Sequence, residues 1–307
     1  MMQTITIGTR GSQLALWQAE YVKKCLNSHF SDLEISLQII KTTGDKIQNR
    51  SLIGLGKGVF TREIELALLD GTVDLAVHSM KDLPTKLPDG LCIGAIPSRE
   101  DPRDVLVSAS GLSLEELPEK AQIGTTSPRR RAQLNFLRPD LTVVGVRGNL
   151  DTRLRKLRET DLDGLILAAA GIKRLVGGET ITEYFEVDTM VPAPGQGALG
   201  IEIREDDGEI RKFLRPINDG DAELAVAAER AVLSGLGGGC QVPIGVHASI
   251  KDGELEMVGM VADLNGKQRV VAQDVGSPKQ ASRIAERLAT SLLSQGAREL
   301  LSEEDNE

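Results

Sequence analysis

Short apolar runs alternate with helical patterns through the first two-thirds of the chain, and this alternation limits the fold more than any other feature. Residues 14–26 form one helical pattern, with Ser12 as the expected N-cap, and residues 60–71 form another that ends at Gly71. Strands interleaved with helices of this length are typical of parallel-rich α/β domains whose sheets are covered on both faces. The expected strands are residues 4–10, 34–41, 74–80 and 91–96, and four more follow between 104 and 171.

The pattern changes after about residue 217, where three strand-like runs lie between two amphipathic helices. Asp221 is the expected N-cap of the first helix. The pairs Asp252-Gly253 and Asn265-Gly266 separate the strands and favour tight hairpins. We therefore expect a small α+β domain built on a three-stranded antiparallel sheet. Its helices are predicted at 221–236 and 278–294, and its strands at 245–250, 254–262 and 268–275.

Composition restricts the class of protein. A chain of 307 residues predicts two or three domains, and 40% hydrophobic with 26% charged residues is the balance of a soluble globular protein. No run of 18 apolar residues is present, and the first residues lack the pattern of a secretory signal. Three widely spaced cysteines argue against a disulfide framework and favour a reducing compartment. We therefore predict a cytoplasmic protein that does not bind a membrane.

Positive charge is concentrated in one part of an acidic chain. The formal net charge is −9, yet residues 121–160 contain nine Lys or Arg against three Asp or Glu. The overall charge opposes nonspecific binding to nucleic acid, while the local surplus indicates a defined anionic ligand. With three histidines and neither a CxxC nor an HExxH motif, the sequence gives no support for a metal site.

Cys240 differs from the other two cysteines because it follows a run of glycines in GLGGGCQVPIG. Cys25 and Cys92 lie within predicted helical and strand patterns, whereas the glycines before Cys240 allow another group to approach closely. A thiolate there can act as a nucleophile or an attachment point. A small residue in a tight turn between domains is the alternative, and the spacing leaves both open.

Arginines cluster in TSPRRR (126–131) and VRGNLDTRLRKLR (146–158). A guanidinium binds carboxylate or phosphate through a planar fork that lysine cannot copy. Arg147 follows an apolar strand, and open α/β sheets bind ligands at the carboxyl ends of their strands. Arg129 and Arg130 also adjoin a strand end, while a solvated helix face remains an equal alternative for residues 155–158.

Two further polar segments follow predicted strands. In HSMKDLP (78–84), Lys81 and Asp82 stand at a strand end, where a carboxylate can steady a cation or accept hydrogen bonds from ring N–H groups. A salt-bridged turn is the alternative. In TRGS, Arg10 precedes a helix N-terminus, which offers N–H donors to an anion. The glycine-rich stretch 42–58 fits either a lid or a plain loop, and GLGKG lacks the spacing of a nucleotide-binding loop.

Ten segments together closely resemble the porphobilinogen deaminase family. The resemblance extends almost from end to end, and several of the segments are long and specific to the family. They are TRGSQLALWQA, KTTGDK, GKGVFTREIE, DLAVHSMKDLP, REDPRD, GTTSPRRRAQL, VRGNLDTRL, LAAAGIKRL, PAPGQGALGIE and GGGCQVPIG.

The resemblance implies an α/β fold with two periplasmic-binding-protein-like lobes and a small α+β C-terminal domain. The implied boundaries are 1–97 with 197–216 for the first lobe, 98–196 for the second and 217–307 for the third domain. The family joins four porphobilinogen molecules head to tail with release of ammonia, giving a linear tetrapyrrole for haem-type biosynthesis. Its dipyrromethane primer is held by a thioether, and GGGCQVPIG puts that attachment at Cys240.

The resemblance also implies the roles of individual residues. Asp82 is the catalytic carboxylate, which stabilises the cation formed when the aminomethyl group of the substrate loses ammonia. The residues implied to bind the cofactor are Cys240, Ser79, Lys81, Asp82, Thr125, Ser127, Arg129, Arg130, Arg147 and Arg153. Those implied to bind substrate are Arg10, Ser12, Lys57, Arg147, Arg153, Arg174 and Gln196.

Two positions depart from the family pattern or extend it. Ile53 lies where some members have a second lysine shortly before the GKG motif, so contacts from 45–56 are not carried over. Arg131 extends the usual arginine pair, and solvent exposure is expected for it.

A two-lobed anion-binding protein and a nucleic-acid-binding protein are the competing classes of protein. An export signal and an aromatic stacking pattern, which those classes favour, are not found. The sequence predicts a monomer.

Overall fold

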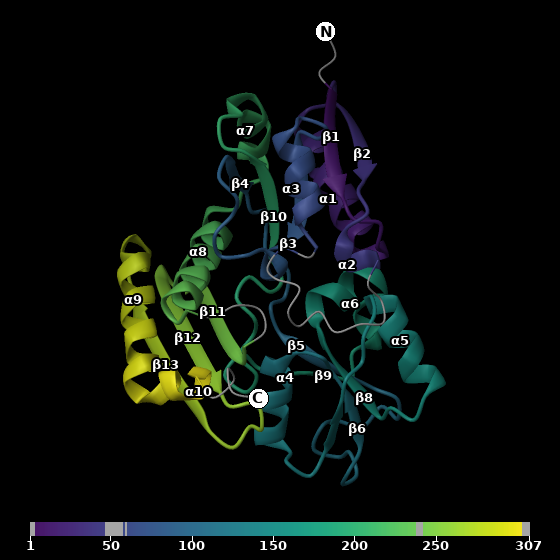
Figure 1. Ribbon diagram of the computed structural model, residues 1–307, viewed down its shortest axis with the longest axis vertical. Helices are drawn as coiled ribbons and strands as arrows, with labels where there is room; N and C mark the ends of the chain where they lie inside the picture. Colours follow the sequence, from purple (N-terminus) through teal and green to yellow (C-terminus); the bar gives the residue numbers. More distant parts are fainter. Residues whose placement is uncertain (1–3, 47–57, 59, 238–241, 303–307) are drawn as a thin grey trace. The chain divides into compact units, whose positions relative to one another are not determined.

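The computed structural model describes residues 4–46, 58, 60–237 and 242–302. The chain forms two compact units (Figure 1). The first contains residues 1–100 and 198–223, and the second contains residues 101–197 and 224–307. The chain therefore leaves the first unit, builds part of the second and returns. The division into three domains stays a prediction.

A five-stranded mixed sheet forms the centre of the first unit, in the order β2-β1-β3-β10-β4. β1 is parallel to both β2 and β3, whereas β10 is antiparallel to β3 and β4. The strands are β1 (Thr4–Thr9), β2 (Glu34–Ile39), β3 (Leu75–Ser79), β4 (Leu91–Ala95) and β10 (Leu199–Arg204). The helices of this unit are α1 (Gln13–His29), α2 (Thr43–Lys46), α3 (Arg62–Leu69) and α7 (Gly208–Leu214), with single 3₁₀ turns η1 (Met80–Asp82) and η3 (Arg215–Ile217).

Helix α1 begins as the sequence predicts. The Ser12 side chain accepts a hydrogen bond from the backbone N–H of Ala15 at 3.3 Å and so caps the helix. Ala19, Val22 and Leu26 recur at helical spacing, and all three are fully buried against the sheet. This packing fixes the loop between β1 and α1 at the carboxyl edge of the sheet.

The second unit contains a sheet of the same design, in the order β7-β6-β8-β5-β9. β6 is parallel to β7 and β8, and β5 is antiparallel to β8 and β9. The strands are β5 (Asp104–Ser108), β6 (Gln122–Gly124), β7 (Thr142–Val144), β8 (Gly164–Ala168) and β9 (Glu183–Tyr184). The helices are α4 (Pro128–Leu137), α5 (Leu150–Glu159) and α6 (Ala169–Leu175), with the 3₁₀ turn η2 (Gly178–Thr180).

The two sheets share one strand order. In each sheet the second strand, β1 or β6, is flanked by two parallel neighbours, and an antiparallel strand lies fourth. These antiparallel strands are β5 and β10, which follow the first two of the three points where the chain passes between the units. The predicted α/β class with two similar lobes is confirmed. The sheets are nevertheless mixed rather than parallel-rich.

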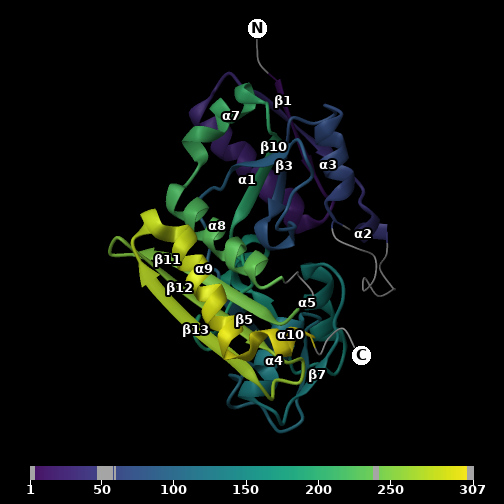
Figure 2. The same ribbon diagram turned by 60° about the vertical axis from the view of Figure 1, so that its left-hand side comes forward.

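The C-terminal part of the second unit is the predicted three-stranded antiparallel meander between helices. Figure 2 shows α9 lying along one face of this sheet, where it contacts β12 and β13. The strands are β11 (Ile244–Lys251), β12 (Glu254–Ala262) and β13 (Arg269–Gly276). The helices are α8 (Gly220–Gly235), α9 (Ala281–Leu292) and α10 (Arg298–Ser302), with short turns η4 (Pro278–Gln280) and η5 (Leu293–Ala297).

Both faces of this small sheet are buried. Along β12, Leu255 and Met257 belong to one core with residues of α8 and α9. Val258 and Met260 point to the opposite face and pack with Val191 of the preceding segment and with α4. The C-terminal sheet therefore lies between its own helices and the helix that carries the TSPRRR arginines.

Two local predictions were wrong. The N-cap of α8 is Asp219 rather than Asp221, because the Asp219 carboxylate accepts hydrogen bonds from the N–H groups of Asp221 and Ala222 at 3.1 and 3.0 Å. The Asn265-Gly266 pair does not form a two-residue turn. The carboxylate of Asp263 instead accepts the backbone N–H of Gln268 at 2.7 Å and closes a wider loop.

Candidate active site

In the first unit, the carboxyl end of β1 carries Arg10 and Ser12. The Ser12 hydroxyl is engaged as the cap of α1. The Arg10 guanidinium stacks over the Phe60 ring, 4.3 Å from its centroid. This contact helps to orient the arginine, and a guanidinium is a group that donates hydrogen bonds to planar anions.

The neighbouring strand β3 ends in the polar residues of HSMKDLP. Ser79 is half-buried, and its hydroxyl accepts a hydrogen bond from Gln18 of α1 at 2.9 Å. Met80 is buried and anchors the following 3₁₀ turn, which ends at Asp82. The Asp82 side chain is exposed, and Lys81 beside it is half-buried. The turn therefore presents a carboxylate at the sheet edge where Arg10 and Ser12 also lie.

In the second unit, helix α4 begins at the equivalent position, after strand β6. The Ser127 hydroxyl caps α4 by accepting the N–H of Arg130 at 3.4 Å, and Pro128 occupies the first helical position. Buried Thr125 accepts the backbone N–H of Ser127 at 3.2 Å. These bonds fix the start of the helix that carries the arginine pair.

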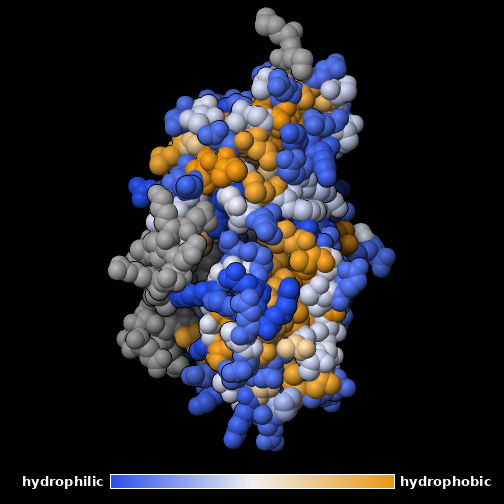
Figure 3. Space-filling model, turned by 90° about the vertical axis from the view of Figure 1, so that its right-hand side faces the viewer, coloured by the Kyte–Doolittle hydropathy of each residue, from blue (hydrophilic) through white to orange (hydrophobic). Residues whose placement is uncertain are grey.

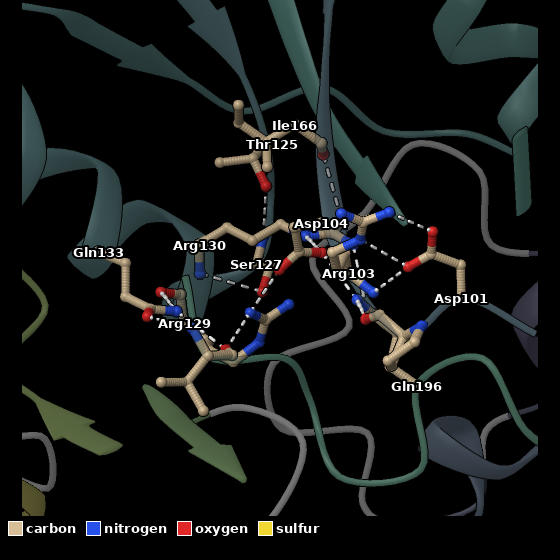
Figure 4. Close-up of polar contacts among 12 residues, drawn as sticks. Asp101, Arg103, Asp104, Thr125, Ser127, Arg129, Arg130, Gln133, Ile166 and Gln196 are labelled. Atoms are coloured by element: carbon tan, nitrogen blue, oxygen red, sulfur yellow. Dashed lines mark hydrogen bonds and ion pairs between the residues drawn. The ribbon is translucent and has the colours of Figure 1, made fainter. Parts of the chain in front are cut away.

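Arg129 and Arg130 both point to one buried carboxylate, that of Asp104 (Figure 4). Arg129 Nη1 lies 2.6 Å from Asp104 Oδ2, and Arg130 Nη2 lies 2.8 Å from Asp104 Oδ1. The two arginines are only 4% and 6% exposed, and Asp104 is fully buried. Two guanidiniums against one carboxylate leave a net positive charge inside the unit.

Gln196 completes this cluster. Its side-chain amide donates to Asp104 Oδ1 at 2.9 Å and to the Pro102 carbonyl at 2.7 Å, while its oxygen accepts from Arg130 Nη2 at 3.4 Å. Arg130 also donates to the Ile166 carbonyl at 3.2 Å. Figure 4 shows these side chains converging on Asp104.

The electrostatics of the cluster favour the charged forms. Burial opposes the ionisation of Asp104, but the charges of Arg129 and Arg130 outweigh it and hold the pKa of that carboxyl well below its usual range. Burial lowers the pKa of Arg129, and a guanidinium stays protonated even so. Asp104 therefore remains a counter-ion for both arginines at neutral pH.

Arg129 has donor capacity that the described residues do not use. Both of its hydrogen bonds come from Nη1, which contacts Asp104 and the Val191 carbonyl. Its Nε is buried without a hydrogen-bond partner among the described residues. A buried donor of this kind is costly unless a ligand or water satisfies it, so this guanidinium suits an anionic group.

Arg147 and Arg153 lie at the N-terminal end of α5. Arg147 is exposed, and its carbonyl accepts from Lys156 at 3.1 Å. Arg153 is half-buried and donates through Nε to the Gly148 carbonyl at 2.9 Å. Figure 3 views the side of the molecule that carries α5 and shows hydrophilic surface there. Basic side chains gather at this end of the helix.

The remaining predicted residues are placed as follows. Arg174 in α6 donates to the Gly197 carbonyl at 2.8 Å, so it reaches the turn that carries Gln196. Arg131 is exposed, as expected. Cys240 and Lys57 lie outside the described residues, as does most of the predicted lid.

Sequence reasoning did not assign Asp104, although it lies in the REDPRD segment. The available signal was an acidic residue opening an apolar strand, DVLVS, whose other positions are largely buried. It also missed Glu229, which is fully buried in α8.

The described residues hold no group of three His, Cys, Asp or Glu arranged to bind a metal ion. No helix in the described ranges is long and apolar enough to cross a membrane.

Comparison with known proteins identifies the two parts of the chain. Residues 5–212 match the family model "Porphobilinogen deaminase, dipyromethane cofactor binding domain", and residues 223–294 match "Porphobilinogen deaminase, C-terminal domain". The class is thus a protein with a domain for a dipyrromethane cofactor, followed by a smaller C-terminal domain.

Full-length relatives agree with both matches. The porphobilinogen deaminase of Syntrophomonas wolfei is 51% identical over 98% of this chain and 99% of its own length. That of Syntrophobacter fumaroxidans is 51% identical over 98% of each chain. The chain belongs to the porphobilinogen deaminase family, which confirms the resemblance seen in its motifs. A crystal structure of the methionine-binding protein MetQ gives a TM-score of 0.45 at 15% identity, covering 74% of this chain and 96% of that one.

The described residues fit a dipyrromethane bearing carboxylate side chains. The donor set is rich in guanidinium and hydroxyl groups, which bind carboxylates. The Nε of buried Arg129 has no hydrogen-bond partner among the described residues, and such a donor suits a carboxylate. The exposed carboxylate of Asp82 is a hydrogen-bond acceptor of the kind that a pyrrole N–H group needs.

Proposed function

We propose that this chain is a transferase that joins four porphobilinogen molecules head to tail, releasing ammonia, on a dipyrromethane attached by a thioether to Cys240. The product is the linear tetrapyrrole hydroxymethylbilane, and the pathway is tetrapyrrole biosynthesis. The observation that supports this most is the match of both family domains along nearly the whole chain. The net positive cluster around Asp104 is independent support.

Charge gives the physical reason for the arginines. Each pyrrole of this substrate carries acetate and propionate side chains, so a growing oligomer gains negative charge with every unit. Guanidiniums bind carboxylates through two parallel hydrogen bonds, and partial burial strengthens these bonds. The proposed substrate contacts come from Arg10, Ser12, Lys57, Arg147, Arg153, Arg174 and Gln196.

The cofactor supplies the free pyrrole α-carbon to which the first substrate is joined. In our proposal the protein holds its carboxylates through the basic and hydroxyl side chains, and its ring N–H groups through Asp82. The residues proposed to bind it are Ser79, Lys81, Asp82, Thr125, Ser127, Arg129, Arg130, Arg147 and Arg153, with Cys240 as its attachment point.

Asp82 is the proposed catalytic residue. Its exposed carboxylate stands at the end of a 3₁₀ turn anchored by buried Met80, so it can face a ligand without losing a fixed position. Positive charge develops on the substrate as its aminomethyl group loses ammonia. A carboxylate held beside the pyrrole N–H groups stabilises that charge and can receive the proton released after coupling.

Intact mass tests the function directly. The purified protein should be heavier than its sequence mass by one dipyrrole and should give colour with Ehrlich's aldehyde reagent. Cys240→Ala should remove both signals, while Cys25→Ala is the matched control and should keep them, because Cys25 lies in α1. A protein without bound pyrrole that still binds carboxylate ligands would instead be an anion-binding module.

We also propose that the protein works as a monomer in the cytoplasm, without nucleic acid or membrane. The net charge of −9 and the lack of a long apolar helix in the described ranges are consistent with this. Light scattering of the holoprotein should give the mass of one chain, about 33.0 kDa. A larger mass at micromolar concentration contradicts the monomer.

A further inference from the structure

Within the second unit, the segment 191–196 connects the arginine helix α4 to the C-terminal sheet and to the part of helix α8 that follows residue 223. At its start, the Val191 carbonyl accepts from Arg129 Nη1 at 2.6 Å and from Gln133 at 3.1 Å. The N–H of Val191 donates back to the Gln133 side chain at 2.7 Å. One end of the segment is therefore bonded to the helix that carries the arginine pair.

The middle of the segment is held by strand β11. The Pro192 carbonyl accepts the N–H of Val246 at 2.9 Å. Gly245 packs so closely that a Cβ there would lie 2.7 Å from the Val191 carbonyl oxygen. A glycine is required at this crossing because any side chain would separate the segment from the sheet.

The far end of the segment is held by two buried carboxylates. Glu229 of α8 accepts the N–H of Gly195 at 2.6 Å and, through its other oxygen, the N–H of Ala248 at 2.8 Å. Gln196, the next residue, donates to Asp104 at 2.9 Å. Glu229 and Asp104 are both fully buried, so each bond forms away from competing water.

We propose that Glu229 and Asp104 are positioning residues, which fix the segment 191–196 and thereby hold Arg129 and Arg130 in register with α8. Helix α8 ends at Gly235, five residues before Cys240. In this proposal, a fixed separation of α8 and α4 helps a dipyrrole tethered to that cysteine to meet the guanidiniums. This inference rests on the proposed function, because it needs the cofactor at Cys240.

The chemistry of the two carboxylates suits this role. An isosteric amide at 229 keeps one acceptor but turns an NH₂ group toward a backbone N–H that loses its partner. An amide at 104 leaves two buried guanidiniums without a counter-ion. Each change loosens one anchor of the segment and keeps the side-chain volume.

Cofactor loading tests the proposal. The full chain is produced without cofactor in a host that cannot make porphobilinogen, then incubated with porphobilinogen while the covalent gain of one dipyrrole is followed by intact mass. For Glu229→Gln and Asp104→Asn we expect the loading rate to fall about 10- to 100-fold, as for misplaced binding groups. Hydrogen exchange in the segment 191–196 should be faster in both variants before any cofactor is added.

Three variants serve as controls. Glu159→Gln removes one partner of an exposed pair with Arg155, and Asp274→Asn removes the partner of Arg287 at the surface. Both should load at the wild-type rate. Leu114→Ala destabilises a core of the same unit without touching the segment, and it should also load normally while it is folded.

The outcomes separate the two claims. Wild-type loading in folded Glu229→Gln and Asp104→Asn overturns the positioning role and leaves the proposed function standing. An equal loss in Leu114→Ala overturns it as well, because lowered stability then explains the defect. If the wild type gains no dipyrrole, the proposed function itself fails and the inference fails with it.

Discussion

The contact between the β12–β13 loop and helix α4 can be tested by adding a single methyl group at Gly266. A Cβ at Gly266 would lie 2.4 Å from the Ala132 carbonyl oxygen and 2.7 Å from the Asn135 Cβ, both in α4. Gly266 also has a φ of +70°, which side chains adopt with strain. Gly266→Ala therefore combines a backbone cost with a steric cost.

Gly253 separates these two costs. It lies in the β11–β12 hairpin with a φ of +82°, and nothing lies within 4 Å of a Cβ built there. The backbone cost of about 1–2 kcal/mol applies to both alanine variants. The overlap with α4 adds about 1–3 kcal/mol for Gly266→Ala alone, because a packed helix must move.

Thermal unfolding of the protein without cofactor provides the assay. At about 2–4 °C per kcal/mol for a unit of this size, the midpoint should fall by about 2–8 °C in Gly253→Ala, with a further drop of about 2–12 °C in Gly266→Ala. Equal midpoints for the two variants would refute the contact. The result matters for the site, because α4 carries Ser127, Arg129 and Arg130.

Three other perturbations follow from the structure. Asp82→Ala should lower turnover by about 10²- to 10⁴-fold and leave the dipyrrole mass in place, and near-normal turnover refutes the catalytic role. Hydrogen bonds from Arg103 and Lys173 overcome the effect of burial and lower the pKa of Asp101 to about 2. Because a lowered folded pKa stabilises above the unfolded value, Asp101→Asn should cost about 1–2 kcal/mol at pH 7 in urea unfolding, and the gap should close between about pH 4 and pH 2. Ser127→Ala, made in a Cys240→Ala chain without cofactor, should lose about 1 kcal/mol of unfolding free energy by removing the cap of α4, and an unchanged midpoint contradicts that.

The sequence predicted the elements well because each one carries a local signal. Ser12 marks the start of α1, and the alternating apolar runs mark β1 to β8, whereas β9 and β10 of the two large sheets were not predicted as strands. Where two signals compete, local reasoning cannot decide. Asp219 and Asp221 are both good caps for α8, and the choice depends on a bond between the N–H of Asp219 and the Ile96 carbonyl at 2.8 Å.

The residues of the candidate site were easier to predict than the contacts that they make with one another. Local patterns showed that Arg129 and Arg130 adjoin a strand end, but not that they are buried on Asp104. That contact joins residues 25 and 26 positions apart and depends on β5 entering the sheet beside β8. The prediction of a two-residue turn at Asn265-Gly266 was wrong for the same reason, because the shape of that loop is set partly by packing against α4.

The two sheets divide the charges that this chemistry needs. Each has a serine-capped helix after its second strand, with Ser12 capping α1 and Ser127 capping α4, so both offer N–H donors at the carboxyl edge. The first sheet adds an exposed carboxylate, Asp82, whereas the second adds a buried cluster with a surplus guanidinium. In the proposed function, the positive cluster binds carboxylates of the acidic oligomer and the Asp82 carboxylate stabilises a cation formed on it. The Asp104 carboxylate is buried and paired with two guanidiniums, whereas the Asp82 carboxylate is exposed, so the two carboxylates are suited to different tasks: Asp104 holds binding groups in place, and Asp82 is accessible to a ligand.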